Sequence, residues 1–151
     1  MRNYRNLMYA VICAVFFALN MSCTTLSERN CPYVIGNINS MCGTGDDSAG
    51  FRFAGVSFTF CNSGSKTVAD FTVSFRLYDS EGENPFIGTN CVTAKKTEII
   101  GRNSTSEITV NLDSFITVVP EEPYQVDYFY VTEIHYTDGS TWRDEYGIYA
   151  L

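Results

Sequence analysis

The feature that most constrains the fold of this chain is an alternation of apolar and polar side chains with a period of two residues. In Val56-Ser57-Phe58-Thr59-Phe60 every second side chain is large and apolar, and Phe71-Thr72-Val73-Ser74-Phe75 repeats the pattern. This period is typical of a β-strand with one face in a core, whereas a helix repeats every 3.6 residues or so. Phe51 and Phe53 lie on the opposite parity, so a bulge near Ala54-Gly55 would be needed to turn these rings inward as well.

Further segments with strand-like composition follow at regular spacing. They are residues 91–100, 108–112, 126–136 and 141–143, and turn residues separate them. Asn62-Ser63-Gly64-Ser65 predicts a hairpin turn between the first two strands, and Asp138-Gly139 predicts a two-residue hairpin turn before the last one. About seven short strands, with no helical periodicity after residue 23, predict an all-β fold: a single antiparallel β-sandwich of the immunoglobulin or fibronectin type.

The long segment 126–136 carries the single histidine of the chain, His135. Apolar and aromatic residues occupy one parity of this segment, namely Val126, Tyr128, Tyr130, Ile134 and Tyr136. His135 shares the other parity with Asp127 and Glu133, so we expect its imidazole on the solvated face of the strand.

The N-terminus has the composition of a secretory signal peptide. Arg2 and Arg5 precede thirteen apolar residues, 7–19, and Ser22 precedes Cys23. At about 1.5 Å per residue this run reaches roughly 20 Å, short of the roughly 30 Å of a bilayer core, which makes a permanent transmembrane helix the weaker interpretation. The placement of Cys23 resembles a bacterial lipoprotein signal, in which that cysteine is lipidated and starts the mature chain. Ordinary cleavage that leaves Cys23 unmodified is the alternative.

The segment 23–50 has the composition of a tether. It begins with polar residues, contains the short apolar piece Tyr33-Val34-Ile35, and combines glycine with Asp46 and Asp47 near its end. The two aspartates do not have the spacing of a twelve-residue calcium loop, so a solvated loop is favoured over a metal site. We therefore expect a lipoprotein signal peptide over 1–22, a tether with a short N-terminal segment over 23–50, and the sandwich over 51–151.

The second strand-like segment ends in Phe75-Arg76-Leu77-Tyr78-Asp79. Phe75 and Leu77 share the parity of Phe71 and are expected in the core, while Tyr78 faces the other way at the end of the strand. Asp79 is expected to start a turn by accepting hydrogen bonds from the backbone that follows it.

This pentapeptide resembles the F-x-L-Y-D signature of the FxLYD domain family. The strand end at Phe60-Cys61-Asn62 and the closing hairpin around Asp138-Gly139 are similar to those of related bacterial surface modules, so the resemblance extends from Phe51 to Tyr146. It implies an immunoglobulin-like or fibronectin-like sandwich on secreted or lipid-anchored bacterial proteins, without assigned catalysis. It therefore bears on the fold more than on the function.

Four cysteines remain when the signal peptide and the anchor are set aside: Cys31, Cys42, Cys61 and Cys91. An even number in an exported chain suggests two disulfides. We expect Cys31 to pair with Cys42 and Cys61 with Cys91. A Cys31–Cys61 or Cys42–Cys91 link would instead staple the N-terminal segment onto the sandwich, and an anaerobic envelope would leave thiols reduced.

Neither catalysis nor nucleic-acid binding is indicated by the sequence. His135 lies in a strand, no C-x-x-C spacing or phosphate-binding glycine loop occurs, and neither Glu121-Glu122 nor Asp144-Glu145 has an identifiable partner carboxylate. A formal net charge of -7 argues against contacts to phosphates. We expect no catalytic residues, no cofactor, no metal and no nucleic-acid partner.

Two classes of function fit these observations. The first is a non-enzymatic, lipid-anchored binding or adhesion module of a bacterial cell envelope, held in the bilayer by acylated Cys23 and contacting a protein through tyrosine-rich surfaces. The second is a structural or assembly subunit that pairs with another envelope protein through an edge strand. An accessory or inhibitory subunit of an envelope enzyme is a third, and secretion is the alternative location. An exposed aromatic patch would favour the first class, and a long uncapped edge strand the second.

Overall fold

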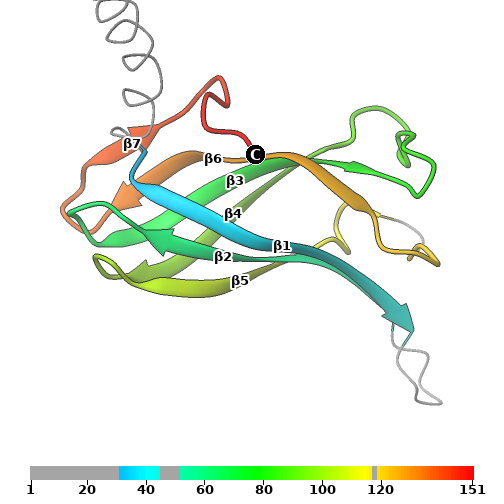
Figure 1. Cartoon of the computed structure of the whole chain (residues 1–151), viewed down its shortest axis with the longest axis horizontal. Coiled ribbons are helices and arrows are strands. Elements are labelled where there is room, and N and C mark those ends of the chain that lie inside the picture. Colours follow the sequence, from blue (N-terminus) through cyan, green and yellow to red (C-terminus); the bar gives the residue numbers. More distant parts are fainter. Residues whose placement is uncertain (1–30, 45–51, 117–118) are drawn as a thin grey trace, which may run out of the picture. The chain divides into compact units, whose positions relative to one another are not determined.

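The computed structural model describes residues 31–44, 52–116 and 119–151 (Figure 1). All described strands belong to one compact unit, Pro32–Leu151. The predicted signal peptide, the lipidation of Cys23 and the acids Asp46 and Asp47 lie outside the described residues.

The described part of the chain forms strands without a helix, arranged in two antiparallel sheets. The strands are β1 (Tyr33–Thr44), β2 (Arg52–Asn62), β3 (Val68–Tyr78), β4 (Cys91–Ile100), β5 (Thr105–Asn111), β6 (Gln125–Tyr136) and β7 (Thr141–Arg143). One sheet has the order β1-β2-β5 and the other the order β4-β3-β6-β7. The predicted antiparallel β-sandwich is thereby confirmed.

The core lies between the two sheets and is rich in phenylalanine. Phe60 of β2 stacks on Phe71 of β3 with ring centroids 4.4 Å apart, and Phe58 lies 4.8 Å from Phe129 of β6. Phe75 stacks on Phe129 in turn, at 5.2 Å. All five rings are at most 1% exposed, so burial of these rings stabilises the contact between the sheets.

The domain begins earlier than residue 51, because β1 is an edge strand of the sandwich and not a tether. Its register with β2 shifts between Gly36 and Asn39, and Asn37 has a φ of 50°. The shift marks a bulge in β1, and β2 itself runs in continuous register past Ala54-Gly55. The predicted bulge in β2 is therefore wrong, and Phe53 lies half-buried on the opposite face from Phe58.

The predicted hairpin between the first two alternating strands is also wrong. β2 pairs with β1 and β5, whereas β3 pairs with β4 and β6, so the turn after Asn62 crosses from one sheet to the other. The Asn62 side chain is fully buried there: its amide nitrogen lies within hydrogen-bond distance of the carbonyls of Lys66, Ile100 and Gly101, and its oxygen accepts a bond from Gly64. One side chain thus joins the two connections that cross between the sheets at this end.

The hairpin at Asp138-Gly139 is confirmed, with one more residue in its loop than predicted. The Tyr136 amide donates to the Ser140 carbonyl, and Gly139, at a φ of 81°, donates to the Tyr136 carbonyl. A three-residue loop with glycine in the left-handed region matches the twist of the flanking strands.

The edge of β6 is covered along much of its length. β7 pairs with residues 133–135, and the Asp144 amide donates to the Thr132 carbonyl. The Val131 amide donates to the Tyr33 hydroxyl of the opposite sheet, and Phe129 exchanges two backbone hydrogen bonds with Leu151. Because these backbone groups are paired, this edge is not open to another strand.

Candidate functional site

The outer face of the β4-β3-β6-β7 sheet carries the polar and aromatic side chains that stand out in the structure. Two of the three register shifts between β3 and β6 add a residue to β6, one between Thr72 and Val73 and one between Ser74 and Arg76. Each leaves β6 with one residue more than β3, as a β-bulge does. Thr132 and Glu133 therefore both point outward, and so do Asp127 and Tyr128.

Because of these bulges, the predicted set of inward-facing side chains on β6 is wrong in part. Phe129 and Val131 are buried, whereas Tyr128 is 38% exposed and Tyr130 is half-buried. The single alternation expected for residues 126–136 fails because the inward parity changes at each bulge. The prediction that His135 lies on the outer face is confirmed.

A tyrosine cluster, defined here as Arg76, Tyr128, Tyr130 and Tyr146, occupies one part of this face. The Arg76 guanidinium lies 5.2 Å from the ring centroid of Tyr128, and the Tyr128 and Tyr130 rings meet edge to face at 5.4 Å. The Tyr128 hydroxyl donates to the Tyr146 carbonyl at 3.1 Å. Tyr128 has a φ of 50°, which is costly for a bulky side chain, so these contacts hold it in a strained backbone position.

The segment after β7 is held to the sheet by a buried carboxylate. Asp144 is 3% exposed, and its oxygens accept hydrogen bonds from the amides of Tyr146, Ile148 and Tyr149. Gly147, at a φ of 64°, lies against the Tyr128 ring, where a Cβ would approach the hydroxyl to 2.8 Å. This support leaves Tyr146 79% and Ile148 69% exposed.

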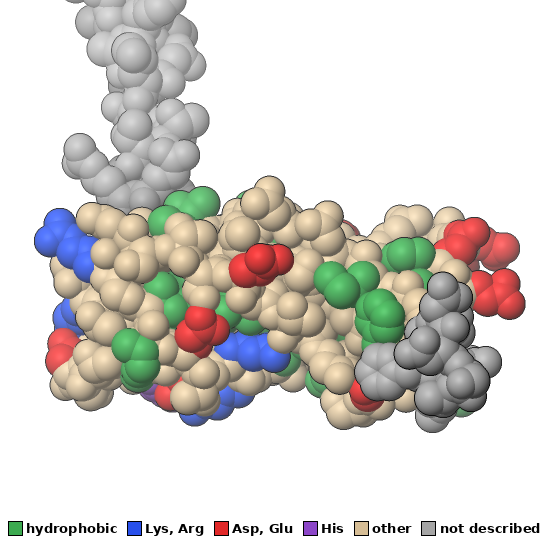
Figure 2. Space-filling model, turned by 90° about the horizontal axis from the view of Figure 1, so that it is seen from below, with side chains coloured by type: hydrophobic (Ala, Val, Ile, Leu, Met, Phe, Trp, Pro, Cys, Tyr) green, Lys and Arg blue, Asp and Glu red, His purple; other side chains and the backbone are tan. Residues whose placement is uncertain are grey.

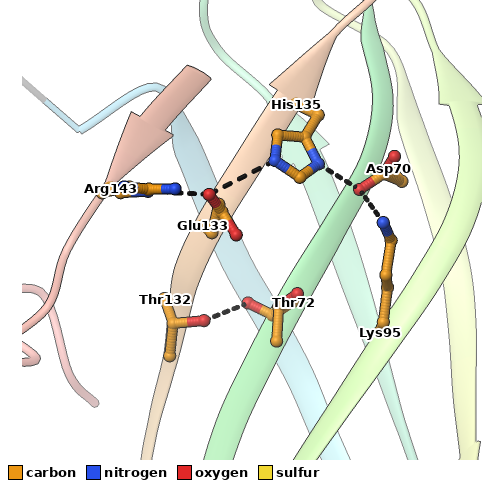
Figure 3. Close-up of polar contacts among 7 residues, drawn as sticks. All are labelled: Asp70, Thr72, Lys95, Thr132, Glu133, His135 and Arg143. Carbon is orange, nitrogen blue, oxygen red and sulfur yellow. Dashed lines mark hydrogen bonds and ion pairs between the residues drawn. The ribbon is translucent and has the colours of Figure 1, made fainter.

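A charged cluster of five side chains lies elsewhere on the same face (Figure 3). Its members are Asp70 of β3, Lys95 of β4, Glu133 and His135 of β6, and Arg143 of β7. Asp70 contacts Lys95 at 3.0 Å and the Nδ1 atom of His135 at 2.7 Å. Glu133 contacts the Nε2 atom of His135 at 3.2 Å and the Nε atom of Arg143 at 2.7 Å. The cluster thus links all four strands of the sheet.

The ion pairs set the protonation of the two acids. Burial raises the pKa of Asp70, but the hydrogen bonds from His135 and Lys95 outweigh it and hold the pKa below its ordinary value of 3.8. The hydrogen bond from Arg143 lowers the pKa of Glu133, and Glu133 in return raises the pKa of Arg143. Both carboxylates are therefore ionised at neutral pH.

Each ring nitrogen of His135 is engaged by a carboxylate, so neither is turned toward a serine or threonine hydroxyl as a nucleophile would require. The hydroxyl of Thr132 donates instead to the Thr72 carbonyl. Within the described ranges no group of three or more His, Cys, Asp or Glu side chains is placed to hold a metal ion.

The F-x-L-Y-D residues have the structural positions predicted for them. Phe75 and Leu77 are fully buried, and Tyr78 is half-buried at the end of β3. Asp79 accepts hydrogen bonds from the amides of Glu81 and Glu83, at 3.0 and 2.8 Å, and so starts the predicted turn. These four side chains build the strand and its turn, whereas Arg76, at the variable position of the pentapeptide, belongs to the tyrosine cluster.

The predicted disulfides are wrong, because the structure forms neither the Cys31–Cys42 nor the Cys61–Cys91 bond. Cys31 lies two residues before β1 and Cys42 near the end of that strand. Nine residues of strand separate Tyr33 from Cys42, a span of roughly 30 Å at about 3.3 Å per residue, whereas a disulfide needs Cα atoms within about 7 Å. Cys61 pairs with Val34 near the end of β2, while Cys91 starts β4 at the other end of the opposite sheet. The Cys91 thiol instead contacts the Ser74 hydroxyl at 3.3 Å.

Sequence reasoning missed the roles of Tyr128 and Asp144. Their sequence context offers no signal for the positive φ of Tyr128, which lies where glycine or asparagine would be usual. In the sequence Asp144 is only one of two adjacent acids, and its burial depends on the path of the chain after β7. Among the described residues, no helix has the length and apolar character to cross a membrane.

Comparison with known proteins finds solved structures that are similar to this chain. No family model and no curated protein matches this chain. A hypothetical protein from Peptoclostridium difficile 630 is similar in structure, with a TM-score of 0.49 and 14% identity, over 77% of this chain and 88% of that one. A Northeast Structural Genomics Consortium target is similar at a TM-score of 0.43 and 16% identity, over 74% of this chain and 79% of that one.

Proposed function

We propose that this protein is a non-enzymatic, lipid-anchored module of a bacterial cell envelope that binds a partner protein through the tyrosine cluster. The observation that carries the proposal is Tyr128, which lies in a β-bulge with a strained backbone. Its hydroxyl donates a hydrogen bond to the Tyr146 carbonyl and so holds the segment that carries Tyr146 in place. Tyrosine and arginine are enriched among the residues that dominate protein interfaces. An aromatic surface already fixed in position loses little conformational freedom on binding, which favours affinity.

The anchor in this proposal is a lipidated Cys23. The resemblance to the FxLYD family, which implies secreted or lipid-anchored bacterial proteins, supports it. A diacylglyceryl group adds at least two acyl chains, and each buried methylene contributes about 0.8 kcal/mol to membrane binding. Mass spectrometry of the native N-terminal peptide tests the anchor. A lipid-modified Cys23 at the start of the chain is expected, and an unmodified Cys23 or a different start would refute it.

The binding face is tested by a photo-crosslinking amino acid placed at position 146 or 148 in native cells. The matched control is position 109 on β5, which is exposed on the other sheet. We expect a protein adduct from positions 146 and 148, reduced when Arg76 is replaced by Ala, and little from position 109. Equal adducts at all three positions would show that the tyrosine cluster is not the contact face.

The second candidate function is pairing with another envelope protein through an edge strand. β4 and β5 are edge strands of their sheets and could serve in this way. β4 is ten residues long and carries Lys95 and Lys96 near its middle. Glu98 of β4 accepts a hydrogen bond from Ser106 of β5. Lysines in an edge strand discourage pairing with another strand, so these features favour the aromatic face over an edge on this side.

A further inference from the structure

The bulge in β1 creates a hollow between the two sheets on the side away from β4 and β5. Before the bulge, Tyr33 and Ile35 point into the core and are 6% and 8% exposed. After it, Ser40 lies opposite buried Val56 and Cys42 opposite buried Ala54. Residues directly opposite each other share a face, so Ser40 and Cys42, and not Met41, face inward here.

Small side chains at these inward positions leave space unfilled. The hollow measures about 360 Å³ and is lined by residues of β1, of the start of β6 and of the segment before it, and by Leu151. Phe129, Val126 and Leu151 give it an apolar wall, while the inward Ser40 supplies a hydroxyl group. Its size and mixed lining suit one apolar side chain accompanied by hydrogen-bonding groups.

Besides the hollow itself, the hydroxyl group of Ser40 points to a ligand. It is buried and has no hydrogen-bond partner among the described residues. A buried polar group without a partner lowers stability, and native proteins seldom retain one without a reason. Asn37, at a φ of 50°, is part of the bulge that turns Ser40 inward, and asparagine adopts this backbone conformation more readily than most residues.

An acidic hollow adjoins the first one. It measures about 250 Å³ and is lined by Asp79, Ser80, Pro120, Glu121, Glu122 and Tyr124. Tyr124 lines both hollows, and burial, together with the charges of Cys42 and Asp79, raises the pKa of its hydroxyl. Acidic side chains gather at one end of the molecule, at the right of Figure 2. Carboxylates beside an apolar hollow favour a ligand that carries positive charge.

We propose that these adjoining hollows bind an extended peptide of a partner protein that bears lysine or arginine. An apolar side chain of the peptide enters the hollow beside Phe129 and Leu151, and its backbone supplies the partner for the Ser40 hydroxyl. Basic side chains further along the peptide reach Glu121 and Glu122. The peptide backbone lies along residues 38–40 of β1, which is the edge strand of its sheet.

The test is an NMR titration of the full chain, purified in the form that cells make, with two capped heptapeptides. The first has the sequence Thr-Leu-Thr-Lys-Thr-Lys-Thr, and the second has glutamate in place of both lysines. We expect the lysine peptide to shift the amide signals of Ser40, Phe129 and Leu151, and to bind about tenfold more tightly than the glutamate peptide. The absence of these shifts, or equal binding of both peptides, would overturn the proposal.

Variants locate the site and separate binding from folding. Ser40→Leu fills the hollow and is expected to weaken the lysine peptide about tenfold or more, whereas Thr109→Leu on the outer face of β5 leaves it unchanged. Ser40→Ala removes the unpaired hydroxyl, so its thermal midpoint should equal or exceed that of the unmodified protein while peptide affinity falls. A Ser40→Ala variant that binds as tightly as the unmodified protein would refute the role of this hydroxyl.

Two double variants test whether the acidic side chains at the second hollow are needed for binding the lysine peptide. The double variant Glu121→Gln/Glu122→Gln is expected to weaken the lysine peptide about fivefold or more, and Glu107→Gln/Glu145→Gln, with the same change in net charge, has little effect. If spermine displaces the peptide at equal concentration, the site accepts small cations and the peptide proposal falls.

Discussion

Replacing Asn62 by Asp tests whether one buried side chain holds the two crossing connections together. The amide nitrogen of Asn62 lies 2.8 Å from the Lys66 carbonyl, 3.0 Å from that of Ile100 and 3.1 Å from that of Gly101. Asn62→Asp keeps the size of the side chain and the oxygen that Gly64 contacts. It replaces the donor with an oxygen that faces these three carbonyl oxygens.

The expected loss follows from the groups left without partners. Each lost hydrogen bond contributes about 1 kcal/mol net, and each buried polar group left unsatisfied costs about 1–3 kcal/mol. Because the side chain is 0% exposed, solvent does not replace the lost donor. We expect Asn62→Asp to lower the free energy of unfolding by about 3–5 kcal/mol, out of a total of about 5–15 kcal/mol.

Chemical denaturation at pH 7 measures this loss, and a second series at pH 4 tests its cause. The new carboxyl is destabilised as an anion in the folded state, so its folded pKa lies above its unfolded pKa. Its penalty is therefore greatest above the folded pKa and shrinks as the pH falls through that value, because the protonated carboxyl regains a donor.

The control is Asn84→Asp, whose side chain makes two local hydrogen bonds in an exposed loop. It should cost less than about 1 kcal/mol, as exposed positions usually do. If both variants unfold at the same denaturant concentration, Asn62 does not hold the crossing connections together.

Three further predictions concern the core, the pH response and the thiols. Phe75→Ala should lower the free energy of unfolding by about 3–5 kcal/mol, because it empties a fully buried site, whereas Tyr78→Phe should change it by less than about 1 kcal/mol; equal denaturation midpoints would contradict the burial of Phe75. The lowered pKa values of Asp70 and Glu133 stabilise the fold above their ordinary values of 3.8 and 4.5, so stability should fall as the pH drops through and below this range, and Asp70→Asn should reduce that dependence. Cys91 is the exposed thiol among the described cysteines and should react with a maleimide first, without prior reduction; no reaction until a reductant is added would show that it is oxidised.

Local alternation predicted the parts of the fold in which the backbone is regular. β3 has its inward residues on one parity from Phe71 to Leu77, as expected, and β4 has the predicted bounds, Cys91–Ile100. The alternation does not predict β1, because the inward residues of this strand change parity at the bulge. The residues after Asn62 predict a hairpin although the chain crosses between the sheets there, because turn residues alone do not distinguish the two connections.

The candidate sites depend on long-range structure that the sequence pattern does not contain. The tyrosine cluster brings Arg76 of β3 beside Tyr128 of β6 and Tyr146 of the C-terminal segment. The cysteine pairings failed for the same reason, since the distance between two cysteines depends on strand register. By contrast, the turn at Asp79 and the outward position of His135 were predictable because both depend on neighbouring residues in the sequence.

The two bulges of β6 also affect how this surface can change in evolution. A bulge residue is an extra residue in its strand, so removing one restores regular pairing without turning the flanking side chains to the opposite face. Loss of Thr132 would leave Val131 and Ile134 in the core, whereas loss of a residue from a regular stretch would reverse every side chain beyond it. Insertions and deletions at these two points can therefore diversify the outer face of the sheet while the phenylalanine core is inherited unchanged.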